Sequence, residues 1–363
     1  MSAEREDGVY AEKPSRSTSQ RKRYLRAAGV LAFIAVNALV LFFTARSDFS
    51  RPGEKLSYSL ASEHSLRNAA CALGCVALAL AAETIKYLLM MKRLKHRLSL
   101  RTAFEATALG KYYDFVTPFG TGGQPFQIWY LHSSGYSGGA ASAMPLAEYI
   151  TKQSAIVLMC LAALSFGRET AGALGIRIAA YAGLLAYLLV PAMVVISALS
   201  PSASARIVGF FVHVGAKLRL LRHPERTVER IEAALTRYSD SLKRLAAGHW
   251  LFAVLFALSL VGQAALFSIP YFVLRVFGGH TPYLQAVCMC VYVYASTTIV
   301  PTPGNAGAAE GSFYLLFEQM EGSGLFWAML AWRFCSYYIF ILLGLVIYAV
   351  KLAENAFSSR RHE

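Results

Sequence analysis

The chain has 363 residues, of which 56% are hydrophobic and only 15% are charged, and its mean hydropathy is +0.44. Soluble domains carry about a quarter charged residues, so this composition argues against a soluble enzyme and indicates an all-α polytopic membrane protein. The net charge of +14 does not indicate a nucleic-acid partner, because the basic residues cluster beside apolar spans, as the positive-inside rule describes.

The N-terminal part begins with a polar stretch, residues 1–20, which we expect to be a disordered cytoplasmic tail. The apolar run 27–45 follows a basic cluster, as in a signal peptide, but it is longer than a signal-peptide core and no A-x-A cleavage site follows it. We therefore predict that it remains in the protein as a membrane anchor.

The transmembrane domain is predicted over residues 21–350, with a cytoplasmic tail at 351–363. A helix needs about 20 apolar residues to cross the hydrocarbon, and six segments meet this criterion: 25–45, 68–91, 141–166, 174–199, 249–277 and 325–350. Basic clusters at 21–26, 92–97, 202–247 and 351–361 place these parts, and hence both termini, on the cytoplasmic side.

The segment 202–247 is basic and amphipathic. Apolar residues recur in it at helical spacing with basic residues between them: Ile207, Phe210, Phe211, Val214 and Leu218. It is predicted either to lie on an anionic membrane surface or to be an ordinary solvated connector.

Two stretches rich in proline and glycine interrupt the apolar sequence, one at 112–130 and one at 300–310. Backbone that leaves the helix at membrane depth must be buried in protein or line a wet cavity. One such break in each half is typical of the substrate path through a transporter.

The orientation of the basic clusters also predicts how the broken segments run. Two crossings already join the cytoplasmic clusters at 92–97 and 202–247, so 100–131 should enter from the cytoplasm and return as a re-entrant hairpin. By the same count, 283–322 should enter from the outside. The two hairpins would then approach the midplane from opposite faces, with an inverted pseudo-symmetry.

Charged residues at membrane depth are costly and are candidates for function. Glu310 and Arg333 have no partner within their own helices, so we expect them to contact a lipid headgroup or to pair with each other. Lys111 and Asp114, three residues apart on one helical face, are secondary candidates.

Other polar pairs have structural interpretations as well. Glu148 and Lys152 stand at i and i+4, so they are either substrate-binding or a neutralising pair that sets helix packing. For Glu83 and Lys86 we favour such an intrahelical pair, with Lys86 reaching the cytoplasmic surface.

Residues near the membrane surfaces also have a structural interpretation. Arg275 is interpreted in the same way as Lys86, reaching the outer surface, and Trp129 and Tyr130 as part of an interfacial aromatic belt.

The first break could itself bind a headgroup. Its glycines at 120–123 permit positive φ and close backbone approach, and free N–H groups at the start of the next helix could bind phosphate. Nearby side chains with hydrogen-bonding tips on apolar bodies suit the same role: Tyr112, Tyr113, Gln124 and Gln127.

No soluble-enzyme motif occurs, and no catalytic residue, cofactor or metal site is predicted. The eight histidines are dispersed. The six cysteines lie in apolar runs without a neighbouring histidine and are interpreted as small buried hydrophobes.

The two breaks carry motifs that resemble those of the membrane region of lysylphosphatidylglycerol synthases, the multiple peptide resistance factors and their flippase-like relatives. The first motif is Tyr113, Thr117-Pro118, Gly122-Gly123-Gln124-Pro125, Gln127 and Gly135; the second is Pro301, Pro303-Gly304, Gly307 and Glu310, followed by Arg333. Asn305 departs from the pattern, because glycine is common there in the family.

The resemblance implies that the chain moves a polar or aminoacylated phospholipid, or a related lipid-linked substrate, between leaflets of the bacterial cytoplasmic membrane. The family's cytoplasmic synthase domain is expected to be absent, because the chain stops at Glu363. The alternatives are a phosphatidylglycerol lysyltransferase-type enzyme and a membrane partner of a separate synthase or glycosyltransferase. A homo-oligomer also stays open.

Overall fold

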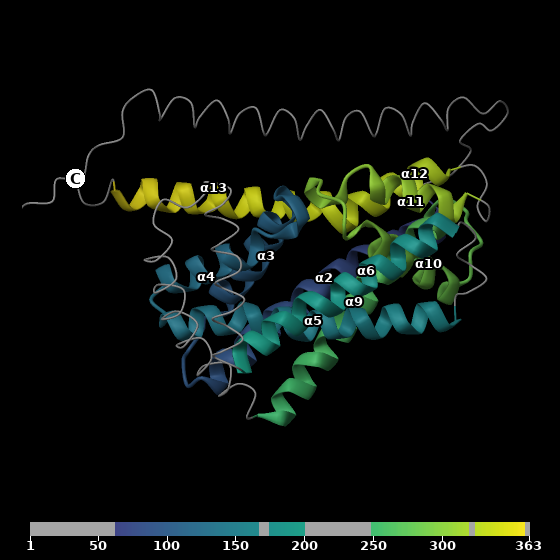
Figure 1. The fold of residues 1–363 in the computed structure, drawn as a ribbon. Coiled ribbons are helices and arrows are strands. Elements are labelled where there is room, and N and C mark those ends of the chain that lie inside the picture. The colour runs from purple at the N-terminus through teal and green to yellow at the C-terminus, as the bar shows by residue number, and fades with distance from the viewer. Residues whose placement is uncertain (1–61, 167–173, 200–247, 319–323, 360–363) are drawn as a thin grey trace, which may run out of the picture.

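The computed structural model describes residues 62–166, 174–199, 248–318 and 324–359, and all elements in these parts are helices (Figure 1). The predicted tail 1–20, the crossing 25–45 and the basic segment 202–247 lie outside the described residues.

Long apolar helices make up most of the described chain. They are α2 (Glu63–Arg93), α5 (Gly138–Phe166), α6 (Leu174–Leu199) and α9 (His249–Val276), followed at the C-terminal end by α12 (Leu325–Arg333) and α13 (Ile339–Ser359). Four stretches are long and apolar enough to cross a membrane: Glu63–Arg93, Gly138–Ser165, His249–Val276 and Leu325–Glu354. These correspond to four of the six predicted crossings, and the protein is a multi-pass membrane protein.

Close backbone contact joins pairs of these helices. Gly262 of α9 faces Ala79 and Ala82 of α2, and a Cβ on Gly262 would lie 3.5 Å from the Ala82 Cβ. At Gly183 of α6 an added Cβ would overlap the carbonyl of Ala295. Small residues let membrane helices approach closely, and here they bring together α2 with α9 and α6 with α10 (Tyr283–Thr297).

The two predicted breaks each separate a pair of shorter helices. The first segment comprises α3 (Leu100–Val116), the 3₁₀ turn η1 (Pro118–Gly120) and α4 (Gly123–Ser133), and the second comprises α10 (Tyr283–Thr297), η2 (Pro303–Asn305) and α11 (Ala308–Phe317). Figure 1 shows α3 and α4 toward one end of the molecule and α10 and α11 toward the other. The turns η1 and η2 contact each other, so both breaks lie at one place.

The two breaks share one backbone conformation. Each opens on an extended threonine followed by proline, which cannot continue a preceding helix. Two residues with positive φ follow, Phe119 (58°) and Gly120 (61°) in the first break and Gly304 (60°) and Asn305 (54°) in the second. The repeated turn has similar geometry in the two halves.

The last apolar stretch contains a π-helical turn, η3 (Phe334–Tyr338), between α12 and α13. Such turns are frequent at functional sites because they re-aim side chains. Here Tyr337 packs against Gly304, and its hydroxyl donates to the Phe115 carbonyl at 3.4 Å. The π turn therefore contacts both broken segments.

Candidate functional site

A cavity of about 690 Å³ lies where the two breaks meet. Residues of both broken segments and of α5, α6, α9 and the α12–α13 stretch line it. Its polar lining includes Lys111, Asp114, Gln124, Lys152, Gln153, Gln263, Arg333 and Ser336. The cavity is thus amphipathic, because Phe119, Leu266, Ile299 and other apolar side chains line the remainder.

Each basic side chain of the cavity wall contacts a carboxylate on another turn or helix. Lys111 Nζ lies 2.8 Å from Glu83 Oε1, and Lys152 Nζ lies 3.7 Å from Glu148 Oε2. Arg333 Nε lies 2.6 Å from Glu310 Oε1. In the described part of the chain, these three carboxylates are not among the cavity-lining residues, so the basic groups face the cavity and the acids lie behind them.

The Glu310–Arg333 pair joins α11 to α12, which confirms one of the two predicted arrangements. Glu310 also accepts a hydrogen bond from the Gly307 N–H at 2.7 Å and so caps the start of α11, where a negative charge is favourable. Arg333 Nη1 donates to the Gly304 carbonyl at 3.3 Å, and the guanidinium lies 5.1 Å from the Trp332 ring centre.

The intrahelical pair predicted for Glu83 and Lys86 is wrong. Lys86 is only 1% exposed and donates to Glu148 Oε1 and Ser259 Oγ, both at 3.0 Å, instead of reaching the surface. Glu83 contacts Lys111 instead. The predicted Glu148–Lys152 contact is present, but Lys86 is the nearer partner of Glu148.

Two of the N–H groups that are predicted to hold phosphate at the first break are already engaged. Thr117 Oγ1 accepts from the Gly122 N–H at 2.9 Å, and Asp114 Oδ1 accepts from the Gly123 N–H at 2.8 Å. A Cβ on Gly122 would lie 2.6 Å from the Thr117 methyl carbon. These two glycines therefore allow the backbone of α4 to lie close to α3. Of the glycines at 120–123, only Gly120 has positive φ.

Several predicted site residues hold helices together. Tyr113 stacks on Phe126, and its hydroxyl lies 2.6 Å from the Tyr348 hydroxyl. Gln127 is buried and donates to the Ala106 carbonyl at 3.3 Å. Among the motif residues of the first break, Gln124 lines the cavity.

Among the motif residues of the second break, too, some line the cavity and others shape the backbone. Gly304 lines the cavity, and Pro303 begins the turn η2, two residues after Pro301.

The aromatic-belt interpretation is wrong for Tyr130. Its side chain is buried, and its hydroxyl donates to Glu105 Oε2 and accepts from Lys351 Nζ at 2.9 Å. Trp129 is 62% exposed, so its place in the belt stays a prediction. Arg275 stacks on Tyr271 at 5.3 Å from the ring centre.

A second charged cluster, which the sequence analysis does not predict, joins Arg101, Glu105, Lys351 and Glu354. Lys351 lies 2.8 Å from Glu105 Oε2, and Arg101 contacts both Glu105 (2.8 Å) and Glu354 (2.6 Å). In the sequence, the i, i+4 spacing of Arg101 and Glu105 indicates the ion pair between these two residues, but not the contacts to α13. The cluster joins α3 to α13 outside the cavity.

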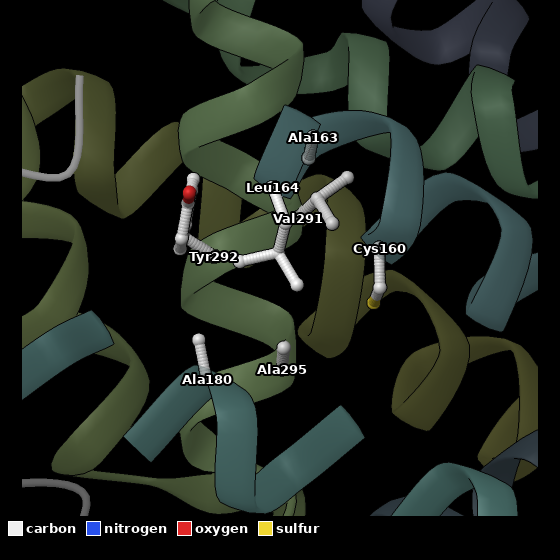
Figure 2. Close-up of a pocket in the computed structure, with 7 residues that line it drawn as sticks. All are labelled: Cys160, Ala163, Leu164, Ala180, Val291, Tyr292 and Ala295. Carbon is white, nitrogen blue, oxygen red and sulfur yellow. The ribbon is translucent and has the colours of Figure 1, made fainter. Parts of the chain in front are cut away.

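The other candidate groups in the described residues, the cysteines and a small apolar gap, do not form a site. All six cysteines are free, and the described ranges contain no group of three or more histidine, cysteine, aspartate or glutamate residues placed to hold a metal. The gap of about 10 Å³ in Figure 2, lined by Cys160, Ala163, Leu164, Ala180, Val291, Tyr292 and Ala295, is apolar. It is a packing defect about the size of one water molecule.

Two comparisons with known proteins agree with this architecture. The chain is 22% identical over 339 residues to a UPF0104 membrane protein of Archaeoglobus fulgidus, and the match covers 91% of this chain and 98% of that protein. Residues 27–344 match the family described as the lysylphosphatidylglycerol synthase TM region. This match covers most of the chain, which therefore belongs to the lysylphosphatidylglycerol synthase TM region family.

Proposed function

We propose that the protein moves a lipid with a polar headgroup between the two leaflets of the cytoplasmic membrane, and that the headgroup occupies the cavity between the two breaks. The observation that carries this proposal is that Lys111, Asp114, Lys152 and Arg333 line one cavity together with residues of the turns η1 and η2, which contact each other. Ionisable groups at membrane depth mark substrate paths.

The proposed topology has six full crossings and two re-entrant hairpins, with both termini in the cytoplasm. The contact between η1 and η2 and their shared turn conformation support hairpins that enter from opposite faces. The headgroup would then be reached from either side as one half of the protein moves against the other.

The amphipathic character of the cavity supports a lipid substrate in particular. Phe119 and Ile299 line the cavity and are 56% and 48% exposed. Apolar side chains beside charged ones suit a molecule with a polar head and acyl chains. We also propose three partners: an anionic membrane surface, which the basic segment 202–247 would bind, a separate synthase, and a second copy of the chain.

Leaflet-resolved labelling of lipids in cells tests the proposal. Cells would carry the wild-type protein, Glu310→Gln, or the double variant Glu105→Gln/Lys351→Gln, which removes a charged pair outside the cavity. We expect Glu310→Gln to trap the substrate lipid in its original leaflet while the control keeps wild-type sidedness.

The same experiment separates the alternatives. An unchanged distribution in Glu310→Gln cells at normal protein level would contradict translocation. Altered total lipid composition with normal sidedness would instead favour the lysyltransferase-type enzyme.

A further inference from the structure

The ionisable side chains that line the cavity are mostly basic. Three basic groups, Lys111, Lys152 and Arg333, line it, whereas in the described chain Asp114 is the one carboxylate that does. The acids that balance the basic groups lie behind them. A ligand in the cavity is therefore closer to the positive charges than to the negative ones, and nearby charges dominate at low dielectric.

Arg333 retains hydrogen-bonding capacity that the protein does not use. The residue is 5% exposed, and its Nη2 has no hydrogen-bond partner among the described residues. Its Nε contacts Glu310 but is too poorly aligned for a hydrogen bond. Buried donors without partners are costly. A ligand in the cavity that is rich in acceptors would supply the hydrogen-bond partners that this guanidinium lacks.

Two neutral side chains add to this pattern. Ser336 and Gln153 both line the cavity, and the Ser336 Oγ and Gln153 Oε1 atoms are buried without a partner in the described chain. The serine hydroxyl can donate to an anionic oxygen, and the Gln153 oxygen can accept from a hydroxyl of the ligand.

The single carboxylate offers little to a cationic headgroup. Asp114 already uses Oδ1 to accept from the Gly123 N–H at 2.8 Å. A headgroup with an added amine would have to approach three basic side chains to reach the remaining oxygen. Like charges in a desolvated site disfavour such a ligand.

We propose that the cavity selects a lipid whose headgroup is an anionic phosphate with hydroxyl groups, and that Lys111, Lys152 and Arg333 bind the phosphate oxygens. This inference rests on the proposed function and names its substrate class. It differs from the aminoacylated headgroup that the family's name suggests, because an aminoacyl amine would add positive charge to a cavity that already presents three basic groups.

Equilibrium binding to the purified full chain in detergent tests the proposal. A fluorescent short-chain phosphatidylglycerol serves as the probe, and unlabelled phosphatidylglycerol, lysylphosphatidylglycerol, phosphatidylcholine and inorganic phosphate serve as competitors. We expect phosphatidylglycerol to bind at least about tenfold more tightly than lysylphosphatidylglycerol, since one lost charge-assisted contact corresponds to roughly this factor.

Two variants that leave no buried carboxylate without a basic partner keep the test independent of folding. Glu83→Gln/Lys111→Gln removes a cavity cation together with its partner, and Lys152→Gln leaves Glu148 paired with Lys86. Both variants should weaken phosphatidylglycerol binding at least about fivefold while the Glu105→Gln/Lys351→Gln control binds as the wild type does.

Three other binding results would contradict the substrate class, the proposed function or the preference for a lipid. Tighter binding of lysylphosphatidylglycerol than of phosphatidylglycerol would overturn the inference and leave the proposed function standing. Equal binding by wild type and every cavity variant would overturn both. Inorganic phosphate competing as well as phosphatidylglycerol would overturn the lipid specificity.

Discussion

Arg333 Nε lies 2.6 Å from Glu310 Oε1, and this contact connects the last apolar stretch to the second broken segment. Both side chains are buried, and Glu310 also caps α11 while Arg333 reaches the Gly304 carbonyl. One ion pair thus determines the positions of a helix start, a turn with positive φ and a cavity-lining guanidinium.

Removing one partner of this pair is expected to be more harmful than removing both. Arg333→Gln leaves Glu310 buried without its counter-charge and should lower the free energy of unfolding by about 3–5 kcal/mol. Glu310→Gln/Arg333→Gln should recover part of that loss. Chemical unfolding in detergent, arranged as a double-mutant cycle, measures the coupling, and additive losses would contradict the pairing.

Gly304→Ala is expected to disrupt the second break. Gly304 has a φ of 60°, and an added Cβ would overlap the Tyr337 ring, so the substitution should cost about 1–3 kcal/mol. Gly311→Ala is the matched control, because Gly311 lies in α11 with no atom within 4 Å of an added Cβ. Thermal unfolding in detergent compares the two, and equal midpoints would argue against the positive-φ turn.

Asn305→Gly is expected to stabilise the protein slightly. Asn305 has a φ of 54°, which glycine adopts without the steric cost that a Cβ carries, and the gain should be less than about 1 kcal/mol. Asn305→Val should lose stability, because a β-branched residue tolerates this conformation poorly. The order Gly, Asn, Val in unfolding midpoint is the expected result; a midpoint for Val above that of Asn would contradict it.

Lys86→Met is expected to destabilise the interior of the helix bundle. Lys86 bonds Glu148 and Ser259, so its loss weakens the charge balance around Glu148 and leaves a buried hydroxyl with fewer partners. Lys92→Met, at an exposed position near the end of α2, is the control. Chemical unfolding in detergent compares the two variants. Equal free energies of unfolding would contradict the buried contacts of Lys86.

The sequence was sufficient to predict the apolar helices and the two breaks, because both depend on local properties. Hydropathy predicts a crossing at 249–277, and in the structure α9 extends over 249–276. Proline stops a helix whatever surrounds it. The Glu310–Arg333 contact was one of two predicted arrangements, since each residue lacked a partner in its own helix.

The pairing of Lys86 with Glu148 and of Glu83 with Lys111 could not be predicted in the same way. Glu83 and Lys86 are three residues apart in α2, which suggests an intrahelical pair. The actual partners depend on which helices are neighbours and on how each is rotated about its axis. The engagement of the Gly123 N–H by Asp114 likewise depends on how tightly α4 turns back on α3.

The measurement that tests the central claim most directly is lipid translocation in proteoliposomes containing the purified chain and labelled phosphatidylglycerol. Wild type and the Glu105→Gln/Lys351→Gln control should exchange the label between leaflets, and Glu83→Gln/Lys111→Gln should be at least about fivefold slower. Exchange no faster than in protein-free vesicles, or equally fast exchange by all three proteins, would contradict translocation through this cavity.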